Sequence, residues 1–96
     1  MAALLARGNA LLGNGDIVSA RLFYEHAAEG GDAQAVLRLG ATYDPAFLAQ
    51  ARLNGGYGDA AAAAQWYRHA LALGAAEAQV LLDGVAANDE VKGSRK

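Results

Sequence analysis

Two histidines, His26 and His69, are the residues whose types most directly suggest metal or acid–base chemistry. They lie 43 positions apart, each within a segment of helical spacing. A zinc or copper site needs several converging ligands and further groups that orient them, and no third ligand shares the register of this pair. The chain has no cysteine, which removes thiolate ligands and thiol nucleophiles. We therefore expect surface or groove positions for both histidines and no metal site.

Glycine-rich stretches at 13–15 and 55–58 have a composition that can cradle a phosphate at the start of the following helix. Each precedes an aspartate, Asp16 or Asp59, whose carboxylate would already fill the place of the anion. No nucleophile elbow, zinc-protease helix or phosphate-binding loop occurs, and no pair of carboxylates suggests acid–base work. The sequence therefore predicts no catalytic residues, no enzyme activity and no cofactor.

Composition also limits the classes of partner that we expect for this chain. Eight basic and ten acidic residues give a formal charge of -2 without a basic stripe, which argues against nucleic acid. No apolar run reaches the 18 or so residues of a membrane span, and residues 1–6 lack the basic start of a signal peptide. Absence of cysteine fits several compartments, so the localisation stays open.

A repeat of 43 residues organises most of the chain. When residues 16–39 are laid over 59–82, aspartate, tyrosine, histidine and glycine positions coincide in one register. The clearest matches are Asp16/Asp59, Ala20/Ala63, Tyr24/Tyr67, His26/His69, Ala27/Ala70, Gly31/Gly74 and Leu39/Leu82, with Phe23 and Trp66 matching as aromatics. A fainter copy, in which residues 3–11 align with 35–43, precedes them. The chain therefore predicts about two and a half repeats.

Each repeat has the pattern of two helices. In the first, Leu4–Leu12 is followed by a glycine turn, an aspartate cap and an amphipathic helix over Ile17–Glu29. A third helix begins after Asp32, a fourth after Asp59, and a fifth is expected over Ala75–Ala87. Aromatic and small residues form the inward stripe of the second and fourth helices, which favours core packing over a base-stacking platform.

The middle repeat contains an insertion of about eleven residues around Pro45, the only proline. Proline disfavours helix at the residue before it and suits the first turn of a new helix, so the third helix should break at Asp44. The spacing of Phe47, Leu48 and Ala51 predicts a short added helix over Ala46–Leu53 that packs against its neighbours. If this chain has a partner specificity of its own, residues 43–57 are the second place to look.

With these residues in view, the chain resembles the Sel-like repeat family of tetratricopeptide-type proteins. Residues 35–43 match the first half of its pattern, and residues 20–31 and 63–74 match the second half. Arg7 and Asp83 depart from it where leucine and glycine are usual, which suggests that the outer units are caps or truncated repeats. The resemblance covers about residues 3–86 and implies a short right-handed α-solenoid of antiparallel helix pairs, with the first helix of each pair on the concave face.

The leading hypothesis is therefore a noncatalytic scaffold or adaptor that binds a partner peptide or helix on this concave face. The side chains beside the core stripe of the first helices are the candidate contacts: Asn9, Gln34, Arg38, Thr42 and Tyr43. The alternative interpretation of these five residues is solvated surface. The alternative hypothesis for the function is self-assembly, in which the solenoid ends form a homodimer or belong to a longer array. The predicted domain spans 1–87, and the polar residues 88–96 are expected to form a disordered tail.

Overall fold

The computed structural model describes residues 2–51 and 58–94, and this part of the chain is mostly helical, without strands. The all-α prediction is thereby confirmed. Six helices occur in the described residues, five of them long and one short: α1 (Ala2–Gly13), α2 (Ile17–Glu29), α3 (Ala33–Tyr43), α4 (Pro45–Gln50), α5 (Ala60–Ala72) and α6 (Ala78–Ser94).

Helices α2 and α5 begin directly after the aspartates that were predicted to cap them. The Asp16 carboxylate accepts a hydrogen bond from the Ser19 amide at 3.1 Å, and Asp59 accepts one from the Ala62 amide at the same distance. Each bond satisfies a backbone donor that the first helical turn leaves without a partner. At the opposite ends, the turns after α2 and α5 pass through Gly31 and Gly74 with φ of 87° and 106°, a conformation that favours glycine.

The last helix differs from the prediction at both ends. Residues 75–77 form a tight turn, in which the Ala78 amide donates to the Ala75 carbonyl at 3.0 Å, so α6 begins three residues later than expected. It then continues to Ser94, through residues 88–94 that were predicted to be a disordered tail. The physical reason is that an existing helix gains one backbone hydrogen bond for each residue it adds.

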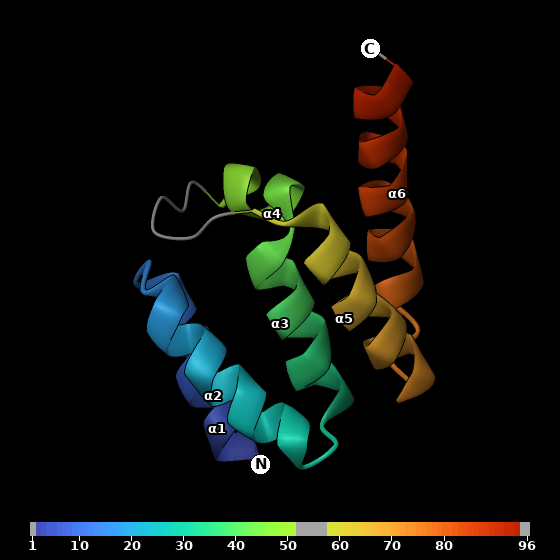
Figure 1. Cartoon of the computed structure of the whole chain (residues 1–96). Helices are drawn as coiled ribbons and strands as arrows, with labels where there is room; N and C mark the ends of the chain where they lie inside the picture. The colour runs from blue at the N-terminus through green and yellow to red at the C-terminus, as the bar shows by residue number, and fades with distance from the viewer. Residues whose placement is uncertain (1, 52–57, 95–96) are drawn as a thin grey trace.

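Helices that follow one another along the chain pack together. Figure 1 shows α2 in front of α1, α3 in the middle, α5 beside α3, and α6 on the far side of α5. The Cα atoms span 44 × 29 × 16 Å, and the shortest dimension leaves room for about two layers of helices. Because α3 contacts both α2 and α5, it joins the two halves of the molecule.

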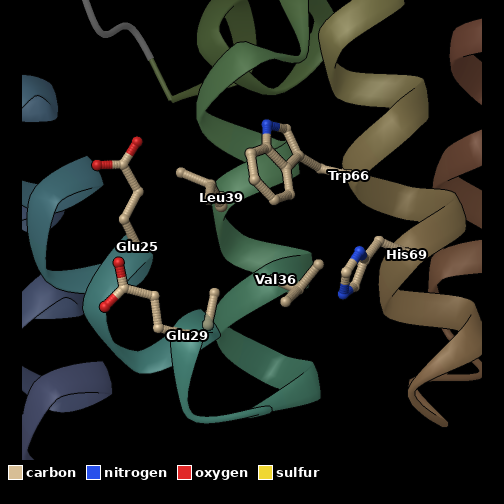
Figure 2. A pocket seen from close by; sticks show the side chains of 7 residues that line it. Glu25, Glu29, Val36, Leu39, Trp66 and His69 are labelled. Atoms are coloured by element: carbon tan, nitrogen blue, oxygen red, sulfur yellow. The ribbon is translucent and has the colours of Figure 1, made fainter.

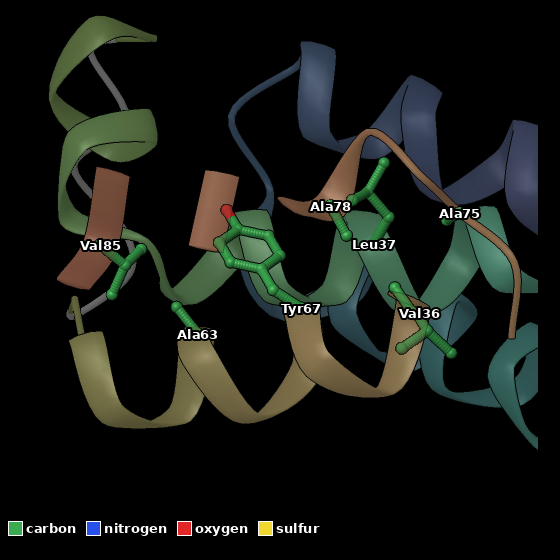
Figure 3. Packing of buried hydrophobic residues seen from close by; sticks show 8 residues of the cluster. Val36, Leu37, Ala63, Tyr67, Ala75, Ala78 and Val85 are labelled. Carbon is green, nitrogen blue, oxygen red and sulfur yellow. The ribbon is translucent and has the colours of Figure 1, made fainter. Parts of the chain in front are cut away.

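Two clusters of buried side chains form the core. The cluster in Figure 3 lies between α3, α5 and α6, with the Tyr67 ring at its centre. The other lies between α1, α2, α3 and α4 around Tyr24. Both tyrosines are fully buried, as are the alanines predicted for the same inward stripes. The core-packing interpretation is confirmed for Tyr24 and Tyr67, whereas Phe23 and Trp66 are only partly buried.

Each buried tyrosine packs against a glycine of the preceding helix. A Cβ placed on Gly8 would lie 2.6 Å from Cε1 of Tyr24, and one on Gly40 would lie 2.8 Å from Cδ1 of Tyr67. Any larger residue would collide with the ring at these distances. The two glycines therefore set how closely α1 approaches α2 and α3 approaches α5.

The insertion around Pro45 is held by one buried carboxylate. Asp44 is 4% exposed; its Oδ1 accepts from the Ala46 amide at 3.0 Å and its Oδ2 accepts from the Tyr67 hydroxyl at 2.7 Å. The first bond caps α4, whose first residue is the proline, and the second ties α4 to α5. The predicted break at Asp44 is confirmed.

The short helix that follows agrees with its prediction where the structure describes it. It covers Pro45–Gln50, while residues 52–57, which include the end of the predicted Ala46–Leu53 helix and most of the second glycine cluster, lie outside the described residues. Leu48 is buried and Phe47 packs against the Tyr24 cluster. The chain then returns to α3, where the Asp59 amide donates to the Tyr43 carbonyl at 2.7 Å.

Candidate functional site

A groove of about 410 Å³ lies between α1, α3 and α4, and we name it the α1–α3 groove. It brings together two of the five predicted contact residues, Asn9 and Arg38. The residues that line it are Asn9, Leu12, Gly13, Arg38, Phe47 and Ala51. The first helices of the two pairs thus do share a concave surface at this point.

The polar side chains of the α1–α3 groove are hydrogen-bond donors. The Oδ1 atom of Asn9 accepts from the Tyr24 hydroxyl at 2.6 Å, which orients the amide and leaves its NH₂ group as a donor. Arg38 is exposed on α3 and contributes a guanidinium with five N–H donors. A ligand of this groove should therefore present acceptors, either carboxylates or backbone carbonyls.

The apolar part of the same groove comes from Leu12 and from Phe47 of the inserted helix. Phe47 is half-buried, so part of its ring contacts the core and part faces the groove. It was not among the predicted contacts, although the insertion that carries it was singled out as the second place to look. Its position depends on how α4 docks, which the spacing of residues 46–53 does not specify.

Thr42 is a correction to the predicted contacts. Its side chain is fully buried; its hydroxyl donates to the Leu39 carbonyl at 2.6 Å and accepts from Arg21 Nε at 3.1 Å. Helical periodicity placed Thr42 beside the core stripe, but Arg21 reaches over from α2 and covers it. Thr42 therefore holds α2 and α3 together and is not available to a partner.

Gln34 and Tyr43 also have partners within the chain. The Gln34 side-chain amide donates to a Glu77 carboxylate oxygen at 3.0 Å, linking the start of α3 to the turn before α6. The Arg21 guanidinium carbon lies 3.9 Å from the centre of the half-buried Tyr43 ring, a cation–π contact. Neither residue lines the α1–α3 groove, so the five predicted contacts do not form one surface.

Glu77 contributes a negative charge near the start of α3. A hydrogen bond from its own backbone, then the one from Gln34, and then the charge of Arg38 lower the pKa of its carboxyl group below the usual value. The side chain stays in water, so these contacts order it without burying a charge.

A second groove, of about 370 Å³, lies on the other side of α3 and is shown in Figure 2; we name it the α2–α5 groove. Glu25 and Glu29 of α2 form one wall, and Trp66 and His69 of α5 form the other. The floor consists of apolar side chains of α3, Val36 and Leu39. The His69 and Trp66 ring centres are 6.3 Å apart. His69 thus lies in a groove, which is one of the two locations that the sequence predicted for it.

Sequence reasoning did not find the α2–α5 groove. Its components were each explained separately, the glutamates as solvated faces and Trp66 as core. The pattern that points to it is Glu25 and Glu29, one turn apart on α2, at the edge of the stripe that α3 covers. Only the packing of α5 on the other side of α3 turns that edge into a groove.

Comparisons with known proteins give no further information about the two grooves. No family model, curated protein or solved structure matches the chain. The likeness to Sel-like repeats thus rests on residues of this chain, and it stays a prediction.

Within residues 2–51 and 58–94, no group of three or more His, Cys, Asp or Glu side chains is arranged to hold a metal ion. None of the helices in this part of the chain has the length and apolar character to cross a membrane. The two grooves are therefore the features on which a functional proposal can be built.

Proposed function

We propose that this chain is a noncatalytic protein-interaction module, a short right-handed α-solenoid of Sel-like repeats that binds a segment of a partner protein in the α1–α3 groove. The observation that carries the proposal is the groove itself, where the donors of Asn9 and Arg38 stand beside the apolar side chains of Leu12 and Phe47. Such a mixture of apolar surface and a few directed polar groups is typical of peptide-binding sites.

The repeat interpretation is supported by matching contacts in the two helix pairs. Tyr24 packs on Gly8 in the first pair, and Tyr67 packs on Gly40 in the second. The caps at Asp16 and Asp59 and the left-handed glycines at 31 and 74 also correspond. Short repeats of this kind bury a shared core and leave the surface of their first helices for binding.

Self-assembly through the ends is the second candidate. Val18 on α2 and Val80 on α6 are 63% and 73% exposed, which favours some cover for them. Against it, the exposed Arg7 and Asp83 stand at the end-unit positions that Leu39 and Gly40 fill within the repeat, and a stacked helix would have to bury those charges. If light scattering showed a dimer over a range of protein concentrations, self-assembly would become the leading hypothesis.

The test selects binders from a random peptide library displayed on phage, with the intact chain as bait. We expect the selected peptides to combine an acidic residue with a bulky apolar one. Their affinity should fall about tenfold for Arg38→Glu, because attraction becomes repulsion. The matched control is Arg68→Glu, the same change at an exposed position of α5 outside the groove, and it should bind as the parent does. Peptides that bind both variants equally well would exclude the α1–α3 groove.

A further inference from the structure

The α2–α5 groove offers chemistry opposite to that of the α1–α3 groove. Its polar wall carries two carboxylates, Glu25 and Glu29, whereas the α1–α3 groove carries a guanidinium. Both glutamates are exposed, and among the described residues no lysine or arginine lies within ion-pair distance of either one. His26 of the same helix has its Nδ1 3.7 Å from Glu29 Oε1, and His69 lines the opposite wall of the groove.

The closest basic side chain on the same helix is used elsewhere. Arg21 lies one turn before Glu25, but its guanidinium donates to the Thr42 carbonyl at 2.6 Å and stacks on the Tyr43 ring. The negative charge of this wall is therefore not neutralised by its own helix. It borders a groove whose other side chains are the imidazole of His69, the Trp66 ring and aliphatic groups.

We propose that the α2–α5 groove binds an arginine side chain of a partner protein, together with an aliphatic residue next to it. The guanidinium would pair with Glu25 and Glu29, and the methylene groups would lie along Trp66 and the apolar floor. Arginine fits better than lysine, since its planar group pairs with carboxylates in a bidentate manner and stacks on aromatic rings. This site is independent of the proposed function of the α1–α3 groove.

The arrangement accounts for affinity that surface charges alone would not give. An exposed ion pair contributes little, because water and salt compete for both groups. In the groove, the aliphatic part of the arginine removes apolar surface from water while its head group reaches the two carboxylates. The charge then selects the ligand, and the apolar contact supplies much of the binding free energy.

Trp66 is the only tryptophan of the chain, so its fluorescence reports on this groove directly. The probes are a short capped peptide with the sequence Leu-Arg-Leu at its centre and a matched peptide with citrulline, which is neutral and has nearly the same shape. We expect the arginine peptide to shift the Trp66 emission in a saturable manner. The citrulline peptide should bind about tenfold more weakly.

Two variants with the same change in net charge separate the site from general electrostatic attraction. The double variant Glu25→Gln/Glu29→Gln should weaken binding of the arginine peptide about tenfold. The control Glu77→Gln/Asp83→Asn removes two exposed carboxylates outside the groove and should bind as the parent does. Arg38→Glu, in the other groove, should not weaken this binding either, so the two proposals fail or hold separately.

Three results would overturn the proposal. The first is no change in Trp66 emission at the highest peptide concentration that dissolves. The second is equal binding of the arginine and citrulline peptides, or an equal loss in the two double variants. The third is a concentration-dependent change in emission of the protein alone that Glu25→Gln/Glu29→Gln abolishes, since the occupant would then be a second copy of this chain.

Discussion

The two buried tyrosines occupy equivalent places but differ in what their hydroxyl groups contact. The Tyr24 hydroxyl donates to Asn9 at 2.6 Å, and Asn9 is an exposed residue that lines the α1–α3 groove. Tyr67 donates to Asp44 at 2.7 Å, a buried carboxylate that also caps the inserted helix. The same packing position thus orients a surface amide in the first helix pair and anchors an insertion in the second. The two helix pairs therefore share a core contact, while the polar end of that contact has a separate role in each pair.

The largest effect should come from removing the two acceptors. Asp44→Ala deletes the cap of α4 and leaves the buried Tyr67 hydroxyl without its acceptor, which should lower the free energy of unfolding by about 3 kcal/mol. Asn9→Ala should cost less than about 1 kcal/mol, because Asn9 is exposed and its removal lets water reach the Tyr24 hydroxyl instead. Urea denaturation followed by circular dichroism measures both. Equal losses of stability in the two variants would contradict the predicted difference between the Tyr67–Asp44 and Tyr24–Asn9 hydrogen bonds.

The next effect should come from the glycines under the two rings. Gly40→Ala should destabilise the fold by about 2 kcal/mol, because the new methyl group meets both the Tyr67 ring and, at 3.1 Å, the Trp66 Cβ. Gly8→Ala should cost less, since α1 packs mainly on α2 and can shift outward. Thermal unfolding of each variant provides the measurement.

Gly84 supplies the matched control for this pair of substitutions. It lies in the exposed part of α6, and no atom of the described residues stands within 4 Å of an added Cβ. Gly84→Ala should therefore stabilise the chain, by about 0.5–1 kcal/mol, through helix propensity alone. If Gly40→Ala were also stabilising, the close approach of α3 to α5 would be wrong.

Local chemistry explains which parts of the fold could be predicted from the sequence. The caps at Asp16 and Asp59 and the break at Asp44 involve neighbours only a few positions away, so the residue types suffice to predict them. The inward tyrosines could be predicted because their spacing recurs. The end of α6 could not, since polar composition indicates exposure and does not specify where a helix stops.

The candidate site depends on contacts that span the fold. Thr42 and Arg21 are 21 positions apart, and helical periodicity does not reveal that one covers the other. Phe47 reaches the α1–α3 groove because Asp44 bonds to Tyr67, 23 positions further on. Periodicity thus placed Asn9 and Arg38 on helix surfaces that line one groove, but it did not reveal which residues of those surfaces neighbouring helices would cover.

The smallest expected effect is a difference between Tyr24 and Tyr67 in how each makes stability depend on alkaline pH. Burial raises the pKa of both phenols, and for Tyr67 the hydrogen bond to Asp44 and the negative charge of that carboxylate raise it further. In the unfolded chain a tyrosine loses its proton near pH 10. Above that pH the unfolded state therefore binds fewer protons than the native state, and stability falls as the pH rises. Well below pH 10 both phenols are neutral in the native and the unfolded state, so neither tyrosine should contribute a pH dependence there.

Each tyrosine that stays neutral in the native state should contribute a slope of up to about 1.4 kcal/mol per pH unit in this range. Tyr67→Phe and Tyr24→Phe each remove one such group and leave the other titrating groups of the chain in place. Because the pKa of Tyr67 has the additional contribution from Asp44, its loss of stability should continue to higher pH than that of Tyr24. Urea midpoints measured between pH 9 and 12 should thus show the flatter profile for Tyr67→Phe. Identical profiles would mean that Asp44 does not distinguish the second tyrosine from the first.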